Sequence, residues 1–150
     1  MKIKILLNVL LVIAMVATVG VFDIRAEEHS EIDNWMEAEM DPSINVETEE
    51  NGIELFAVNK AINWNVKNNT LKMTSGFNKK KGSKVTINLL VNHVSGVKIG
   101  IINNKSKIKR YTKATLTTKG TFTIPETSSY SVFVENTSGN SVKVQGWYRR

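Results

Sequence analysis

Apolar and polar positions alternate along most of the chain after residue 54. In the run "VTINLLV" (85–91), every second residue is apolar, and the same period recurs in "VKIGII" (97–102). Successive side chains of a β-strand point to opposite faces of the sheet, so this period predicts strands that bury one face. The other runs that predict strands are "LFAV" (55–58), "INWNV" (62–66), "NNTLKMTSGF" (68–77), "IKRYT" (108–112), "TFTI" (121–124), "YSVFVEN" (130–136) and "SVKVQGWY" (141–148).

Turns rich in Gly, Asn, Ser and Lys separate these runs at intervals of roughly ten residues. Many short strands at this spacing are typical of an antiparallel sandwich or barrel, and no strand–helix–strand alternation is found. We therefore predict an all-β fold: an antiparallel β-sandwich of about eight strands, preceded by a short N-terminal helix.

The stretch "FTIPETSSYSVFVEN" (122–136) predicts a hairpin that closes the sandwich. Pro125 has no backbone N–H to donate and suits the end of a strand. The second strand divides its side chains between two faces: Tyr130, Val132 and Val134 on one, and Ser131, Phe133 and Glu135 on the other. "NTSGN" (136–140) predicts a tight turn into the final strand "VKVQGWY" (142–148), its expected partner.

The runs "KKGSKVTINLLV" (80–91), "VKIGIINN" (97–104) and "FTIPETSSYSVFVENTSGNSVKVQGWY" (122–148) resemble uncharacterised small exported β-sandwich proteins of Gram-positive bacteria. Their general plan is similar to that of the prepeptidase C-terminal type of accessory domain. The glycine expected near the turn is replaced here by Ser128 or Ser129. The resemblance implies a fold and an exported location, and its motifs are structural rather than catalytic.

Residues 1–26 have the pattern of an export signal. Lys2 and Lys4 precede an apolar run that ends at Phe22, and Ala26 offers a small residue at a cleavage point. This arrangement is typical of a signal peptide and predicts a secreted or extracellular protein, associated with the cell surface or free. An uncleaved membrane anchor is the alternative, because the run approaches the roughly 18 residues that can span a bilayer. The chain has no Cys, so disulfides and lipidation of a cysteine are excluded.

Charge is divided sharply along the chain. Residues 27–54 contain eleven acidic residues and no Lys or Arg, whereas residues 55–150 contain seventeen Lys or Arg against Glu126 and Glu135. We therefore predict three regions: a signal peptide (1–26), an acidic segment (27–54) and a basic β-sandwich (55–150). The acidic segment either folds back on the basic body, or stays solvated and leaves that body to an anionic partner.

Within the acidic segment, "SEIDNWMEAEMD" (30–41) predicts a short helix. Ser30 is followed by an acid three residues later, which is a weak variant of a capping box, and Pro42 ends the pattern. A helix of about three turns would be marginal alone. Trp35 and Met36 fall near helical spacing and either pack on the sandwich or contact a membrane or partner.

Few groups in the basic body suit catalysis or metal binding. His93 and Ser95 are close in sequence, but a Ser–His–acid site also needs a carboxylate, and only Glu126 and Glu135 are present. Those two carboxylates would be the only pair for acid–base chemistry. The zinc motif HExxH, a cysteine pair and an acidic calcium loop are all missing. We predict no enzyme activity, no cofactor and no metal site.

Two lysine-rich stretches are the predicted binding site. They are "NKKKGSK" (78–84) and "KSKIKRYTK" (105–113), and clustered cations bind polyanions through salt-dependent, nonspecific attraction. The predicted site residues are Lys79, Lys80, Lys81, Lys84, Lys105, Lys107, Lys109 and Arg110. The alternative role of these lysines is solubility and protection of sheet edges. The aromatic residues Trp64, Trp147 and Tyr148 form either a carbohydrate platform or part of the packing.

Together these features predict a noncatalytic binding or interaction module at the cell surface. Its partner is an anionic cell-wall polymer or a protein, without specific recognition of nucleic acid. Contact with a membrane is predicted only through the signal segment or through weak attraction to its surface. A secreted antimicrobial or toxin-like effector that acts on membranes is the alternative.

Overall fold

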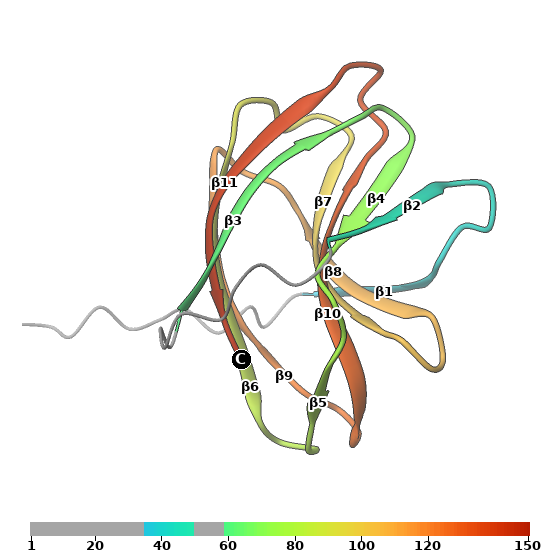
Figure 1. Ribbon diagram of the computed structural model, residues 1–150, viewed down its shortest axis with the longest axis vertical. Helices are drawn as coiled ribbons and strands as arrows, with labels where there is room; N and C mark the ends of the chain where they lie inside the picture. The colour runs from blue at the N-terminus through green and yellow to red at the C-terminus, as the bar shows by residue number, and fades with distance from the viewer. Residues whose placement is uncertain (1–34, 50–58) are drawn as a thin grey trace, which may run out of the picture.

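The computed structural model describes residues 35–49 and 59–150, whose strands form two facing sheets around one core (Figure 1). The predicted β-sandwich is confirmed, with eleven strands in the described residues, more than the sequence indicated. Within those two ranges, no helix has the length and hydropathy needed to cross a membrane. The predicted signal peptide (1–26) and the predicted strand "LFAV" (55–58) lie outside the described residues.

One sheet has four strands and the other has seven. The four-stranded sheet has the order β3 (Asn59–Val66), β11 (Val142–Arg149), β6 (Lys84–Val91) and β9 (Thr117–Thr123). The seven-stranded sheet has the order β1 (Met36–Glu39), β8 (Ile108–Lys113), β7 (Val97–Asn103), β10 (Ser128–Asn136), β4 (Thr70–Met73) and β2 (Asn45–Thr48), and β5 (Phe77–Lys79) also pairs with β10.

Alternate positions of the strands build the core between the sheets. Val85, Ile87, Leu89 and Val91 of β6 are all buried there, as their spacing predicted. The inner face of β10 follows the prediction too, with Tyr130, Val132 and Val134 in the same cluster. Each such aliphatic side chain stabilises the fold by roughly 1.5–3 kcal/mol when fully removed from water.

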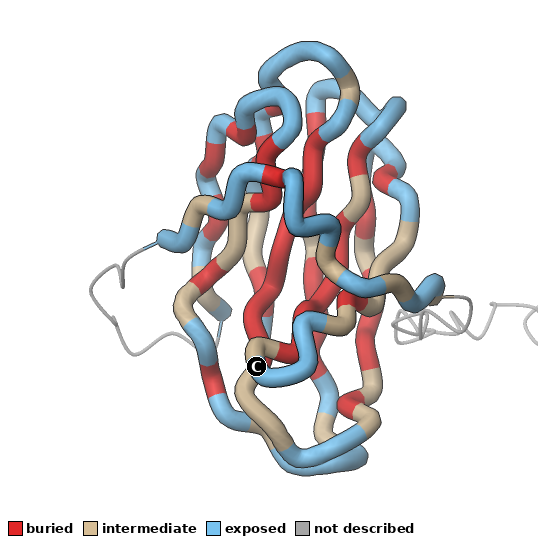
Figure 2. Tube along the Cα trace, turned by 90° about the vertical axis from the view of Figure 1, so that its right-hand side faces the viewer, coloured by how far each residue is buried: buried red, intermediate tan, exposed pale blue. Residues whose placement is uncertain are grey.

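The described part of the acidic segment, residues 35–49, forms a feature that we call the strap. It supplies β1 at one edge of the seven-stranded sheet and β2 at the other, and it crosses the outer face between them (Figure 2). β1 pairs antiparallel with β8, whereas β2 pairs parallel with β4, so the sheet is mixed rather than wholly antiparallel. Over these residues the acidic segment folds back on the basic body.

The helix predicted over residues 30–41 is wrong where the structure describes it, because Met36–Glu39 forms β1. Residues 30–34 lie outside the described part of the chain. Glu37 and Glu39 alternate with less polar neighbours, so the same letters also fit the period of a strand. Pairing with β8 places Glu37 directly opposite Arg110, a stabilising cross-strand contact that a short isolated helix does not offer.

A second apolar cluster lies beneath the strap, on the outer face of the seven-stranded sheet. Ile44 of the strap is buried in it, together with Leu71, Ile102 and Phe133 of the sheet. Because strand neighbours point to opposite faces, Ile102 and Phe133 face away from the main core. The strap therefore covers apolar surface that would otherwise face water.

The stretch 122–136 is not the predicted hairpin, because β9 and β10 belong to different sheets. The link from Ile124 to Thr127 crosses between the sheets, and Pro125 follows the end of β9 as expected. β10 and β11 also lie in different sheets, so residues 137–141 form another crossing rather than a hairpin turn. β11 pairs with β3 and β6 and not with β10. The alternation of apolar residues identifies the buried face of a strand but not its neighbours.

Two glycines permit unusually close approach between paired strands. A Cβ atom at Gly100 of β7 would lie 2.0 Å from the carbonyl oxygen of Arg110 on β8. A Cβ atom at Gly146 of β11 would lie 2.1 Å from the carbonyl oxygen of Asn88 on β6, and its φ of 146° also favours glycine. Any side chain at either position would push the paired strands apart.

Candidate functional site: the basic end of the sandwich

The first lysine-rich stretch forms the turn between β5 and β6. Lys79 is half-buried at the end of β5, Lys80 and Lys81 are exposed in the turn, and Lys84 begins β6. The backbone N–H of Lys81 donates to the Thr127 hydroxyl over 3.1 Å, and that of Gly82 donates to the Ile124 carbonyl over 2.8 Å. These bonds fix the turn against the link between β9 and β10.

The second lysine-rich stretch begins in the turn between β7 and β8. Lys105 and Lys107 are exposed there, and Lys107 has a φ of 61°. The Asn103 carboxamide holds the turn, because its Oδ1 accepts the N–H of Lys105 over 2.9 Å. Its Nδ2 donates to Glu126 Oε1 over 2.6 Å, which attaches this turn to the same link.

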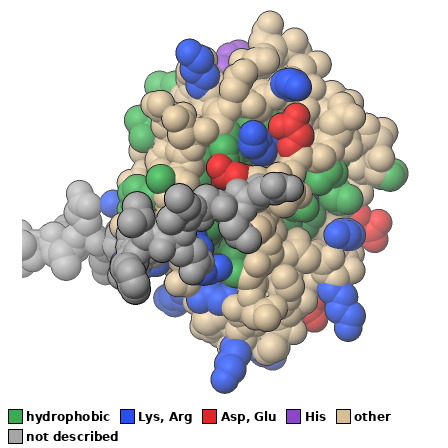
Figure 3. Space-filling view, in the orientation of Figure 1, with side chains coloured by type: hydrophobic (Ala, Val, Ile, Leu, Met, Phe, Trp, Pro, Cys, Tyr) green, Lys and Arg blue, Asp and Glu red, His purple; other side chains and the backbone are tan. Residues whose placement is uncertain are grey.

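Both turns therefore flank the link from Ile124 to Thr127, at one end of the sandwich. We call Lys80, Lys81, Lys105 and Lys107, with this link between them, the basic end. It lies at the lower end of the molecule in Figure 1, and Figure 3 shows Lys and Arg side chains around that end. The structure thus brings together two lysine groups that are separated by more than twenty residues in the sequence.

Lys109 does not belong to this exposed group. It is 2% exposed on the outer face of β8, where its ammonium group binds the carboxylate of the buried Glu135. Lys98 contacts the other oxygen of Glu135 over 2.7 Å. Lys109 is therefore a structural cation that an external anion does not reach.

The cluster of Lys98, Lys109 and Glu135 shifts the titration of its members. Burial opposes the ionisation of Glu135, but hydrogen bonds from Lys109 and Lys98 outweigh that effect and hold its pKa below the ordinary value. The hydrogen bond to Glu135 raises the pKa of Lys98. Asp41 of the strap adds a second negative charge nearby; hydrogen bonds from Ser43 lower its pKa, and the two lysines contribute to the shift.

Arg110, the last predicted site residue, is also engaged within the molecule. Its guanidinium contacts Glu37 of β1 over 2.9 Å and lies 3.9 Å from the centroid of the Trp35 ring. Trp35 packs against the main core, whereas Met36 beside it is exposed. Arg110 thus fastens the start of the strap to β8.

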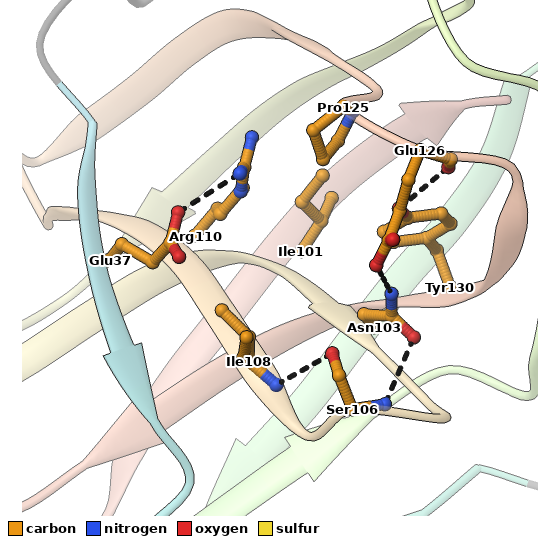
Figure 4. A pocket seen from close by; sticks show the side chains of 9 residues that line it. All are labelled: Glu37, Ile101, Asn103, Ser106, Ile108, Arg110, Pro125, Glu126 and Tyr130. Atoms are coloured by element: carbon orange, nitrogen blue, oxygen red, sulfur yellow. Dashed lines mark hydrogen bonds and ion pairs between the residues drawn. The ribbon is translucent and has the colours of Figure 1, made fainter.

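A pocket of about 230 Å³ opens between Arg110 and the link (Figure 4). Glu37 and Arg110 lie on one side of it, and Glu126 with Asn103 and Tyr130 on the other. Ile101, Ile108 and Pro125 supply apolar walls, and Ser106 completes the lining.

The charged groups that line this pocket already have partners within the protein. Arg110 is paired with Glu37, and the carboxylate of Glu126 accepts a hydrogen bond from Asn103. Burial raises the pKa of Tyr130, and the nearby Glu126 carboxylate adds to the rise. The Tyr130 hydroxyl therefore stays protonated, and it donates a hydrogen bond to the backbone carbonyl of Glu126. The exposed lysines outside the pocket are therefore better placed than Arg110 to attract an anion.

The groups considered for catalysis are not assembled. Glu126 lines the pocket, whereas Glu135 lies on the outer face of the seven-stranded sheet under the strap. His93 and Ser95 are exposed in the loop between β6 and β7. Across the two described ranges, no three His, Cys, Asp or Glu residues are grouped so as to hold a metal ion.

The three aromatic residues considered as a carbohydrate platform do not lie on one face. Trp64 and Tyr148 are buried in the core, and Trp64 donates its indole N–H to Glu49 of the strap over 2.9 Å. Trp147 is half-buried on the outer face of the four-stranded sheet, among polar residues that the sequence-based site did not include. The alternation in "VKVQGWYR" was the signal that could have shown this, because it places Lys143, Gln145, Trp147 and Arg149 on one face.

No protein-family model and no curated protein matches this chain. The solved structures that resemble it include PliG of Aeromonas hydrophila, a periplasmic lysozyme inhibitor of g-type lysozyme, and a mutant of the corresponding inhibitor from Escherichia coli. The first is 9% identical with a TM-score of 0.46, covering 70% of this chain and 96% of that one. The second is 11% identical with a TM-score of 0.43, covering 71% and 97%. At TM-scores below 0.5, neither likeness bears on the function of this chain.

Proposed function

We propose that this protein is an exported, noncatalytic binding module that holds an anionic polymer at the basic end of its sandwich. The observation that carries the proposal is the convergence of Lys80 and Lys81 with Lys105 and Lys107 on the two sides of one link. An extended polyanion carries many charges and can contact both turns at once.

The partner class follows from the chemistry of these side chains. Exposed ammonium groups on long flexible stems bind repeated phosphates or carboxylates through charge rather than shape. Phosphate-containing cell-wall polymers have this chemistry, and so has a strongly acidic protein surface. The exported location in the proposal rests on the sequence of residues 1–26 alone.

The backbone of the basic end supports a binding role as well. Each turn is attached by hydrogen bonds to the link between β9 and β10, so the spacing between the two lysine pairs is set by the fold. A preorganised arrangement of cations loses less entropy on binding than flexible tails do. The separation of Glu126 from Glu135 supports the noncatalytic part of the proposal.

The test measures the affinity of the purified protein for long-chain polyphosphate at low and high salt. We expect the variant Lys80→Glu, Lys81→Glu and the variant Lys105→Glu, Lys107→Glu each to bind roughly tenfold more weakly at low salt, with a reduced salt dependence. The control is Lys67→Glu with Lys113→Glu, an equal change of net charge at the other end of the sandwich, which should have a smaller effect. Equal losses in all three variants would show that only net charge matters and would exclude the basic end as a site.

A further inference from the structure

The outer face of the four-stranded sheet presents one continuous set of side chains. On β11, Val142, Val144 and Tyr148 enter the core, so Lys143, Gln145, Trp147 and Arg149 point the other way. The neighbouring strand β3 pairs Asn65, Asn63 and Ala61 with Lys143, Gln145 and Trp147 in that order. The polar residues of this set are exposed, Trp147 is half-buried, and its cross-strand partner Ala61 has only a methyl group as its side chain.

On the other side of β11, strand β6 adds both amide and apolar groups. Asn88 lies opposite Trp147, and Leu90 lies opposite Gln145. Leu90 is 54% exposed, whereas its neighbours Leu89 and Val91 point the other way and are buried in the core. The centre of this face therefore combines an indole ring, a leucine and several carboxamides.

The charge of this face has a single sign. None of β3, β6, β9 and β11 contains an acidic residue, whereas Lys143 and Arg149 stand on β11 and Lys119 on β9. The strap, which carries acidic residues, pairs instead with the seven-stranded sheet on the opposite side of the sandwich (Figure 1), although the Glu49 side chain also contacts the core-facing Trp64 of β3. The two outer faces thus differ: the strap brings negative charge to one, and the strands of the other carry only positive charge.

We propose that this face binds an acidic polysaccharide, a chain of uronic-acid type that lies along β11. The C–H face of a sugar ring packs on an indole, which is large, flat and apolar with a polar edge. Carboxamides such as Asn63 and Gln145 donate and accept hydrogen bonds with sugar hydroxyls. Lys143 and Arg149 pair with the carboxylates of the chain.

The geometry of the strand sets the length of the site. With a rise of about 3.4 Å per residue, Lys143 and Arg149 are about 20 Å apart along β11, and Trp147 lies between them. This spacing suits an extended chain of several sugar rings rather than a single sugar. It is a different surface from the basic end, and it requires a ring where the basic end requires only charge.

Three probes separate ring recognition from charge: polygalacturonate, which has rings and carboxylates; long-chain polyphosphate, which has charge without rings; and dextran, which has rings without charge. We expect Trp147→Ala to bind polygalacturonate about tenfold more weakly, while its affinity for polyphosphate changes less than twofold. Trp147→Phe keeps an aromatic ring and should retain most of the affinity for polygalacturonate.

A second variant guards against a folding defect in Trp147→Ala. Lys143→Gln with Arg149→Gln changes two exposed side chains and should remove the preference for polygalacturonate over dextran. The proposal is overturned by unchanged binding of polygalacturonate in Trp147→Ala, or by equal losses for polygalacturonate and polyphosphate. Binding to polyglutamate or to anionic vesicles that depends equally on Trp147 would also overturn it, in favour of a protein or a membrane partner. Loss of binding in Lys80→Glu, Lys81→Glu alone would assign the polysaccharide to the basic end.

Discussion

Lys109 shows how a single long-range contact decides the role of a residue. In the sequence it stands among Lys105, Lys107 and Arg110 and has the appearance of one more surface cation. In the fold it is buried against Glu135, which lies 26 residues further along the chain and faces the same way from β10. No local sequence pattern predicts that pairing. The cations of β8 alternate in the same way whether their face of the strand is exposed to water or covered by another segment.

We expect Lys109→Met to lower the free energy of unfolding by about 3 kcal/mol, because it leaves a buried carboxylate with only Lys98 as a partner. Urea denaturation followed by tryptophan fluorescence measures the change. The matched control is Lys107→Met, an exposed lysine two residues away, which should change stability by less than about 0.5 kcal/mol. Adding Glu135→Leu to Lys109→Met should restore most of the loss, and a double variant as unstable as the single one would contradict a charge-pairing role.

At the scale of elements, the sequence predicted most strands and few of their neighbours. The period-two pattern located β6, β7 and β10 and the faces they bury, because burial of alternate residues is a local property. It did not show that β9 and β10 belong to different sheets, because a short link with turn residues can connect two strands of one hairpin or cross from one sheet to the other. The first strand of the strap was missed for a related reason. The twelve residues 30–41, with scattered apolar positions, fit a helix and a strand alike, and only the pairing of β1 with β8 decides between them.

The strap should be among the least stable elements of the described fold, because each of its two strands lies at a sheet edge and pairs with one neighbour along only four residues. We expect Ile44→Ala to release it, since Ile44 is the strap's buried residue in the outer apolar cluster and its truncation costs about 2–5 kcal/mol. Hydrogen exchange should then accelerate at the amides of β1 and β2 while β6 and β10 stay protected.

Val46→Ala provides the matched control for the strap, because Val46 is 44% exposed two residues further on. It should leave the protection of β1 unchanged. Uniform acceleration over the whole sandwich in Ile44→Ala would mean that the strap unfolds only together with the body.

At the scale of the whole molecule, acidic and basic side chains lie on different faces, and the acidic strap does not cover all of the basic residues. The sequence left two interpretations open for the acidic segment, and its described residues, 35–49, fold back on the sandwich. Glu37 and Glu47 pair with cations of the seven-stranded sheet. The lysines of the basic end are exposed, and Lys143 and Arg149 of β11 face away from the strap. Sequence counts gave the correct totals but not this arrangement, which depends on the face that each strand turns outward.

The same distribution predicts how the stability of the molecule responds to acid. The pKa of Glu135 is below its ordinary value of 4.5 in the folded state, so the unfolded chain binds the proton more readily. The stabilisation from Glu135 is therefore complete above about pH 4.5 and is lost as the pH falls through the lower pKa of the folded state. We expect the free energy of unfolding, measured by urea denaturation from pH 7 to pH 3, to fall more steeply below pH 4.5 in the wild type than in Lys109→Met, Glu135→Leu, which lacks the pair. Asp41 of the strap titrates in both proteins and keeps its hydrogen bonds from Ser43, the main cause of its lowered pKa, so most of its contribution cancels from the comparison even though the variant lacks Lys109. Parallel profiles would show that the buried pair is not the source of acid sensitivity.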